Sequence, residues 1–163
     1  MRAITALALL AFVATAAAQA EAQDVSAEPT YGDVSLSAGF TPDPHHIELT
    51  AGGSNAINKG DCSYGNAADA PDVDLYWESS GVTLYIYVIG DDDTTLLVNT
   101  PNANWLCDDD SYGDGDPIVM IPNASAGLYD IWVGTYGEDM VSATLYISEI
   151  DPRQAPEAPF FRW

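Results

Sequence analysis

The residues best suited to do chemistry in this sequence form a short acidic stretch at positions 108–116. Its sequence DDDSYGDGD places five carboxylates in nine residues, immediately after Cys107. A metal cage, a catalytic carboxylate pair and a solvated turn are all open interpretations. Calcium takes about six to eight oxygen ligands, several of them carboxylates, from a loop flexible enough to wrap around the ion. The carboxylate ligands would be Asp108, Asp109, Asp110, Asp114 and Asp116.

The spacing of these carboxylates does not match an EF-hand, because position 119, the twelfth from Asp108, is Val119 rather than a glutamate. A second acidic run, at 91–93, follows a strongly apolar segment. Loops of a β-sandwich gather at its two ends, so both runs could lie at one end, where each pair of like charges would repel by ~1 kcal/mol. We therefore predict a calcium site at 108–116, with Asp91 and Asp93 as further candidate ligands. A merely solvated acidic turn is the alternative.

Catalytic residues are harder to assemble from this sequence. The only histidines, His45 and His46, are adjacent, and no serine lies in a G-x-S-x-G motif. A carboxylate mechanism needs two acids held at a fixed separation across a sugar cleft. Nothing in the acidic stretch indicates that one of its carboxylates is desolvated. The sequence therefore predicts no catalytic residue and no enzyme.

The N-terminus predicts the compartment. Residue Arg2, an apolar run at 4–18 and small alternating residues at 16–20 are typical of a cleaved secretory signal, here 1–20. The run is too short and too rich in alanine to span a bilayer. We expect a secreted or periplasmic protein, in which Cys62 and Cys107 form a disulfide. Closing a loop of about 46 residues would stabilise the fold by ~4 kcal/mol in the chain-entropy model.

The net charge excludes some partners. The chain has 25 acidic and four basic residues, so nucleic acid and anionic lipid would be repelled. Intrinsic disorder is the other usual reason for such a charge, but 47% hydrophobic and 10% aromatic residues provide enough material for a core. The composition predicts a folded domain with a strongly anionic surface.

The elements that would position these residues are short strands. Apolar and polar residues alternate in many runs separated by Gly, Pro, Asn and Asp. The candidate strands are 34–38, 47–49, 72–78, 82–90, 94–99, 116–121, 128–136 and 143–149. We predict an all-β antiparallel sandwich, jelly-roll-like, with eight or nine strands. It would occupy residues 31–150, between a flexible lead-in at 21–30 and a Pro-rich, aromatic tail at 151–163.

Aromatic residues at outward positions form a candidate binding surface. Alternation along 82–90 turns Tyr85 and Tyr87 away from the core, and alternation along 128–136 turns Trp132 outward. Such a row could stack on sugar rings or grip a protein. Cross-strand pairing that only stabilises the sheet is the alternative.

The segment from Asp91 to position 149 resembles a known family. The pieces CDDDSYGDGDP and GLYDIWVGTYG are similar to the bacterial pre-peptidase C-terminal domain. This resemblance implies a calcium-associated β-sandwich, a module often appended to secreted peptidases as an accessory. It does not imply peptidase activity for this chain, in which no catalytic domain accompanies the module.

Three functions follow as hypotheses. The first is a secreted, non-enzymatic binding or accessory module, stabilised by calcium, whose partner is an extracellular protein or polysaccharide. The second is an envelope structural or assembly protein that makes contact through its aromatic tail, at Phe160, Phe161 and Trp163. The third is a hydrolase related to secreted peptidases.

Overall fold

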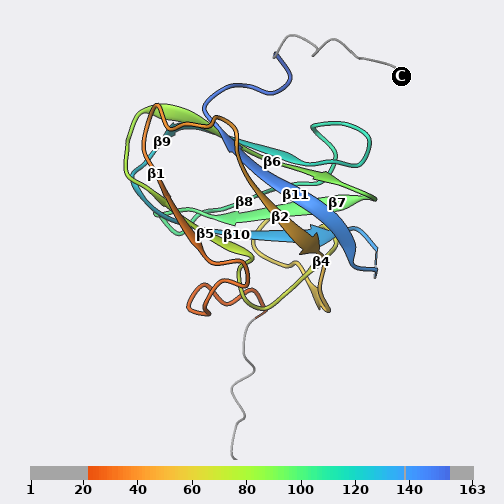
Figure 1. The fold of residues 1–163 in the computed structure, drawn as a ribbon. Helices are drawn as coiled ribbons and strands as arrows, with labels where there is room; N and C mark the ends of the chain where they lie inside the picture. The colour runs from red at the N-terminus through yellow and green to blue at the C-terminus, as the bar shows by residue number, and fades with distance from the viewer. Residues whose placement is uncertain (1–21, 138, 155–163) are drawn as a thin grey trace, which may run out of the picture.

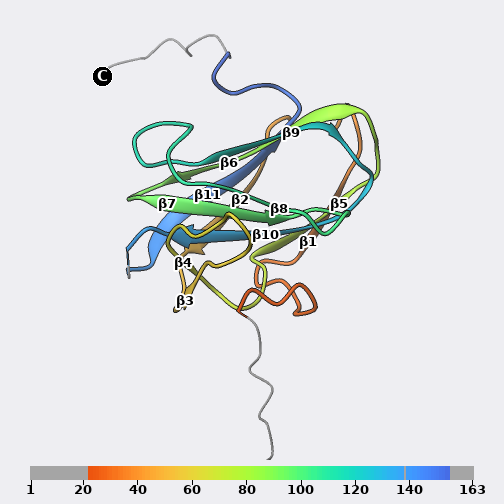
Figure 2. The ribbon, with the colours of Figure 1, turned by 180° about the vertical axis from the view of Figure 1, so that it is seen from behind.

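The chain forms two packed β-sheets in a computed structural model that describes residues 22–137 and 139–154. Figures 1 and 2 show the strands in two layers, with no helix in the described part of the chain. Accordingly, no helix there is long and apolar enough to cross a membrane. The predicted signal at 1–20 and the aromatic end of the tail at 160–163 lie outside the described residues.

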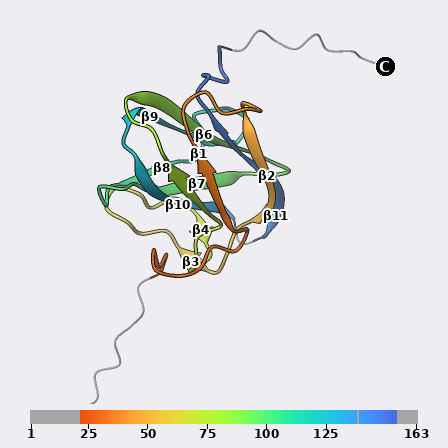
Figure 3. The same ribbon diagram turned by 60° about the vertical axis from the view of Figure 1, so that its left-hand side comes forward.

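One sheet has four antiparallel strands. Their order is β2 (His45–Ala51), β11 (Val141–Ser148), β6 (Val82–Gly90) and β9 (Ile118–Ala124). In β6, Leu84, Ile86 and Val88 are fully buried, as the period-2 alternation of the sequence predicts. This sheet contains β2 and β11 at the right of Figure 3, beside the layer that contains β1 and β10.

The other sheet has seven strands around β10 (Gly127–Thr135). One side of β10 pairs first with β5 and then with β4, and the other side pairs with β7. The strands that complete this sheet are β1 (Asp33–Leu36), β3 (Asn55–Ala56), β4 (Asn66–Ala67), β5 (Val73–Trp77), β7 (Thr94–Asn99) and β8 (Trp105–Asp108). The pairing of β1 with β5 is parallel, whereas the other pairings are antiparallel.

The main core fills the space between the two sheets. Trp77 and Tyr129 from one sheet and Leu145 and Ile147 from the other are among its buried residues. Phe40 packs edge-on against Trp77, with ring centroids 6.3 Å apart. The all-β sandwich predicted from the sequence is therefore confirmed.

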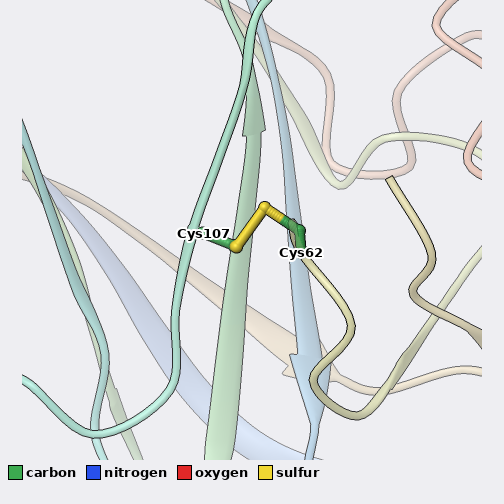
Figure 4. The surroundings of a disulfide bond; sticks show 2 residues. All are labelled: Cys62 and Cys107. Atoms are coloured by element: carbon green, nitrogen blue, oxygen red, sulfur yellow. A yellow bond between two sulfur atoms is a disulfide. The ribbon is translucent and has the colours of Figure 1, made fainter. Parts of the chain in front are cut away.

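A second, smaller core covers the outer face of the seven-stranded sheet. It contains Ile57, Ala67, Leu97 and Trp132, and it is joined by the Cys62–Cys107 disulfide, which confirms the predicted pairing (Figure 4). Trp132 turns away from the main core as predicted, but it is 0% exposed, so its assignment to a binding surface is wrong. The disulfide-linked segment and Trp105 bury it, and the two indole rings lie 5.5 Å apart.

The lead-in also differs from its prediction. Residues from Gln23 onward pack on the domain instead of forming a flexible segment: Asp24 N donates to Asp69 O at 2.7 Å, and Thr30 N donates to Pro71 O at 2.8 Å. Gln23 itself is buried. These contacts satisfy backbone groups beside β5, so the folded domain begins before residue 31.

Buried carboxyl groups join β5 to β10 along a seam formed by Asp72, Asp74 and Asp130. The pairing of β10 with β5 ends at Ile131. Further along β10, Val133 N donates a hydrogen bond to the side-chain Oδ2 of Asp72 at 2.7 Å. Burial raises the pKa of Asp72 to about 7, although this hydrogen bond opposes the shift. The Asp72 side chain thus replaces a strand neighbour at the gap between β5 and β4.

Asp74 and Asp130 are cross-strand partners in the same seam. They are 9% and 4% exposed, and Asp74 Oδ1 and Asp130 Oδ1 are both buried without a hydrogen-bond partner in the described part of the chain. Burial, followed by the charge of Asp74, raises the pKa of Asp130 to about 6. Burial, followed by the charges of Asp33 and Glu28, raises the pKa of Asp74. Two buried carboxyl groups so placed disfavour each other's ionisation.

Candidate functional site at the acidic end

Three loops meet at one end of the sandwich, which we call the acidic end: residues 91–93, residues 109–117 and the described residues of 136–140, which are 136, 137, 139 and 140. In Figures 1 and 2 they lie on the same side of the molecule. Gly90 N donates to Asp116 Oδ1 at 2.9 Å, and Tyr136 N donates to Asp93 O at 3.2 Å. The prediction that the two acidic runs share one end is confirmed, and a third loop joins them.

Carboxylates at the acidic end affect one another's ionisation. Partial burial raises the pKa of Asp93, and the charges of Asp110, Asp92 and Asp116 raise it further. The pKa of Asp109 is raised in the same way, by burial and then by Asp110 and its other acidic neighbours. The acidic end therefore concentrates mutually repelling negative charge.

The predicted calcium ligands do not form a ready-made cage. Asp108 Oδ2 accepts hydrogen bonds from Ser111 N at 2.9 Å and Ile118 N at 2.8 Å, so this carboxylate shapes the loop. Asp116 Oδ1 likewise accepts a backbone hydrogen bond, from Gly90 N. Among residues 22–137 and 139–154, no three His, Cys, Asp or Glu side chains come together in a group that could hold a metal ion. Asp93 Oδ1 is buried without a hydrogen-bond partner in this part of the chain, and calcium binding stays a prediction.

The loop at 136–140 separates two clefts. The larger, about 670 Å³, is lined by Asn55, Asn66, Asp69 and Met140 together with 52–54 and Ala68. The smaller, about 260 Å³, is lined by Asp92, Asp93, Thr135, Tyr136, Gly137, Asp139 and Val141. Two large side chains on this loop, Tyr136 and Met140, are 60% and 62% exposed.

The predicted aromatic surface is largely covered. Tyr87 is 6% exposed, because its ring stacks on Tyr146 at 4.8 Å and lies 5.1 Å from Tyr112 of the acidic stretch. Both neighbours and burial raise the pKa of Tyr87, to about 12, with burial as the main cause. The assignment of Tyr87 to an exposed platform is wrong, and Tyr85 is half-buried. Cross-strand pairing accounts for this row.

The neighbouring histidines are also part of this sheet. His45 and His46 lie in β2, where their side chains alternate between faces. His46 lies 6.2 Å from Tyr146 and extends the aromatic row. Burial lowers the pKa of His45, with the neighbouring His46 charge as the lesser cause.

Sequence reasoning missed the loop at 136–140. Its sequence YGEDM lies between two strands and combines an aromatic residue and a methionine with two acids. Large apolar residues in a short polar turn between strands have no core to enter. That signal would have placed Tyr136 and Met140 on the surface.

Comparisons with known proteins are sparse. No family model matches the chain, and no curated protein matches it. Among solved structures, a periplasmic inhibitor of g-type lysozyme from Aeromonas hydrophila is 15% identical, with a TM-score of 0.38. The match covers 75% of this chain and 98% of the inhibitor. A superposition this loose transfers neither a site nor a partner.

Proposed function

We propose that the chain is a secreted, non-enzymatic binding module whose acidic end docks a cationic extracellular protein. The observation that supports this most directly is the exposure of Tyr136 and Met140 on one loop between two clefts. Tyrosine is enriched at the energetic centres of protein interfaces, and methionine adapts to irregular surfaces. Tyr136 lines a cleft with Asp92, Asp93 and Asp139, and Met140 lines the cleft that contains Asp69.

Charge favours a basic partner. The chain has a formal net charge of −21, and the acidic end concentrates part of it where carboxylates already repel one another. A complementary positive surface would relieve that repulsion and would be steered to this end during diffusion. An acidic or neutral partner would gain neither effect.

A polysaccharide is the weaker of the two predicted partners. Two of the residues predicted to stack on a sugar, Tyr87 and Trp132, are covered by other rings, and an uncharged sugar would not relieve the repulsion between the carboxylates. Calcium is kept as a proposed stabiliser of the same end, supported by the mutual repulsion at Asp93 and Asp109 and by the buried oxygen of Asp93.

Site-specific cross-linking tests the docking surface. A photoreactive p-benzoylphenylalanine replaces Tyr136 in the protein expressed in its native host, and Tyr76, 44% exposed on the seven-stranded sheet, receives the same change as a control. We expect a discrete adduct with one basic extracytoplasmic protein from position 136 and none from position 76. Equal adducts from both positions, no adduct, or an acidic partner would contradict the proposal.

A further inference from the structure

The larger cleft has an unusual balance of polar groups. Its lining residues have one charged side chain, Asp69, and two amides, Asn55 and Asn66. Met140 adds a long apolar side chain at the rim. The cleft therefore combines hydrogen-bond acceptors, one of them the negatively charged carboxylate of Asp69, with the flexible apolar side chain of Met140.

The backbone of Asp69 is fixed by the domain, and its exposed side chain makes one hydrogen bond. Its backbone carbonyl accepts hydrogen bonds from Asp24 N at 2.7 Å and from Trp132 Nε1 at 3.3 Å. Its side-chain Oδ1 accepts one from Asn55 Nδ2 at 2.9 Å. A carboxylate has about four acceptor positions, so this bond leaves most of its capacity for an incoming donor. The hydrogen bond from Asn55 restricts this carboxylate before binding, which lowers the side-chain entropy that binding costs.

The amides are oriented by the protein as well. Asn66 Nδ2 donates to Gly137 O at 3.1 Å, which ties β4 to the loop at 136–140. The side-chain nitrogens of Asn55 and Asn66 thus each donate to an acceptor within the protein. The side-chain oxygen of each amide is its hydrogen-bond acceptor. The backbone also keeps the cleft in shape, because a Cβ on Gly53 would overlap the backbone of Ala67.

We infer that this cleft takes an arginine side chain of the cationic partner. The guanidinium would donate to Asp69 and to an amide oxygen, and its methylene chain would lie against Met140. The inference rests on the proposed function and names the anchor of the partner.

Arginine fits this cleft better than lysine. Its planar fork has five donors in fixed directions, which suits acceptors on several side chains, and it is more weakly hydrated than an ammonium group. A lysine would place a compact, strongly hydrated charge beside one carboxylate. A metal ion would need several carboxylates, whereas this cleft has one.

Titration of the full chain with N-acetyl-arginine-N-methylamide, followed by NMR, tests the inference. The citrulline analogue has nearly the same shape without the charge. We expect shifts at the side-chain amides of Asn55 and Asn66 and at the Met140 methyl, with binding at least about tenfold weaker for citrulline. Equal binding of the two compounds, or shifts scattered over the surface, would overturn the inference.

Two variants make the test specific. Asp69→Asn removes the charge but keeps an oxygen for Asn55, and we expect it to weaken arginine binding by about tenfold. Glu78→Gln removes one exposed charge far from the cleft and is expected to bind arginine as the parent does. Unchanged amide spectra away from the cleft show that both variants fold. Equal loss in both variants would contradict a specific site.

The test separates this inference from the proposed function. If the arginine probe fails while cross-linking at position 136 succeeds, the partner docks on the acidic end without an arginine in this cleft. If the probe binds but cross-linking fails, the cleft recognises arginine and the docking proposal is wrong.

Discussion

Two groups of aspartates in this molecule have the same chemistry and opposite surroundings. In the seam between β5 and β10, Asp72 and the Asp74–Asp130 pair are buried and have raised pKa values. At the acidic end, carboxylates on three loops are partly or fully exposed and repel one another. The first group is enclosed by the sheet and its covering segments, whereas the second lies at the surface, where we propose that it meets a cationic partner. The position of an aspartate in the fold, rather than the number of aspartates nearby, determines its role.

The largest expected effect is the pH dependence of stability. The folded-state pKa of Asp72 is about 7, above its ordinary value of 3.8, so the folded chain binds the proton more tightly. The stability this contributes is present below the ordinary value and is lost as pH rises through the folded value. We expect the free energy of unfolding to fall by about 2 to 3 kcal/mol between pH 5 and pH 8. Urea unfolding at pH 5 and at pH 8 measures this difference in the free energy of unfolding.

Asp72→Asn identifies the group responsible. The amide oxygen can still accept from Val133 N, but it does not titrate. The variant should therefore lose most of the difference between pH 5 and pH 8. A variant that keeps the parent's slope, or a parent whose stability rises with pH, would assign the effect elsewhere.

A smaller effect distinguishes the two regions directly. Asp130→Asn removes a buried charge whose pKa is about 6, so we expect it to stabilise the protein by about 1 kcal/mol at pH 8 and much less at pH 5. Asp92→Asn at the exposed acidic end should change stability by less than about 0.5 kcal/mol at either pH. Similar effects of the two substitutions would remove the distinction between the regions.

The smallest expected effect is that of calcium. If a divalent ion relieves repulsion at the acidic end by about 1 kcal/mol, the melting temperature should rise by roughly 2–8 °C relative to EDTA. Magnesium at the same concentration controls for general screening. A midpoint that does not respond to calcium would show the calcium prediction to be wrong.

The sequence predicts the sandwich well, because alternation in segments such as 82–90 reports directly on which face is buried. It also predicts the meeting of the acidic runs, since loops gather at the ends of a sandwich. It places Trp132 on the outer face correctly, but not its burial, which depends on a disulfide-linked segment covering that face. The four-residue strand β8 has too few residues for its alternation to be recognised. Cleft residues such as Asn55, Asn66 and Met140 come from β3, β4 and the segment after β10, so no local pattern unites them.

Binding of a cationic test protein to two charge-matched variants tests the central claim most directly. Asp92→Asn with Asp139→Asn removes two charges from the acidic end, and Glu28→Gln with Glu78→Gln removes two exposed charges elsewhere. Isothermal titration with cytochrome c at low ionic strength gives the dissociation constants. We predict about tenfold weaker binding for the first variant and less than about twofold for the second. Equal losses would mean that only net charge matters, and would contradict a docking surface at the acidic end.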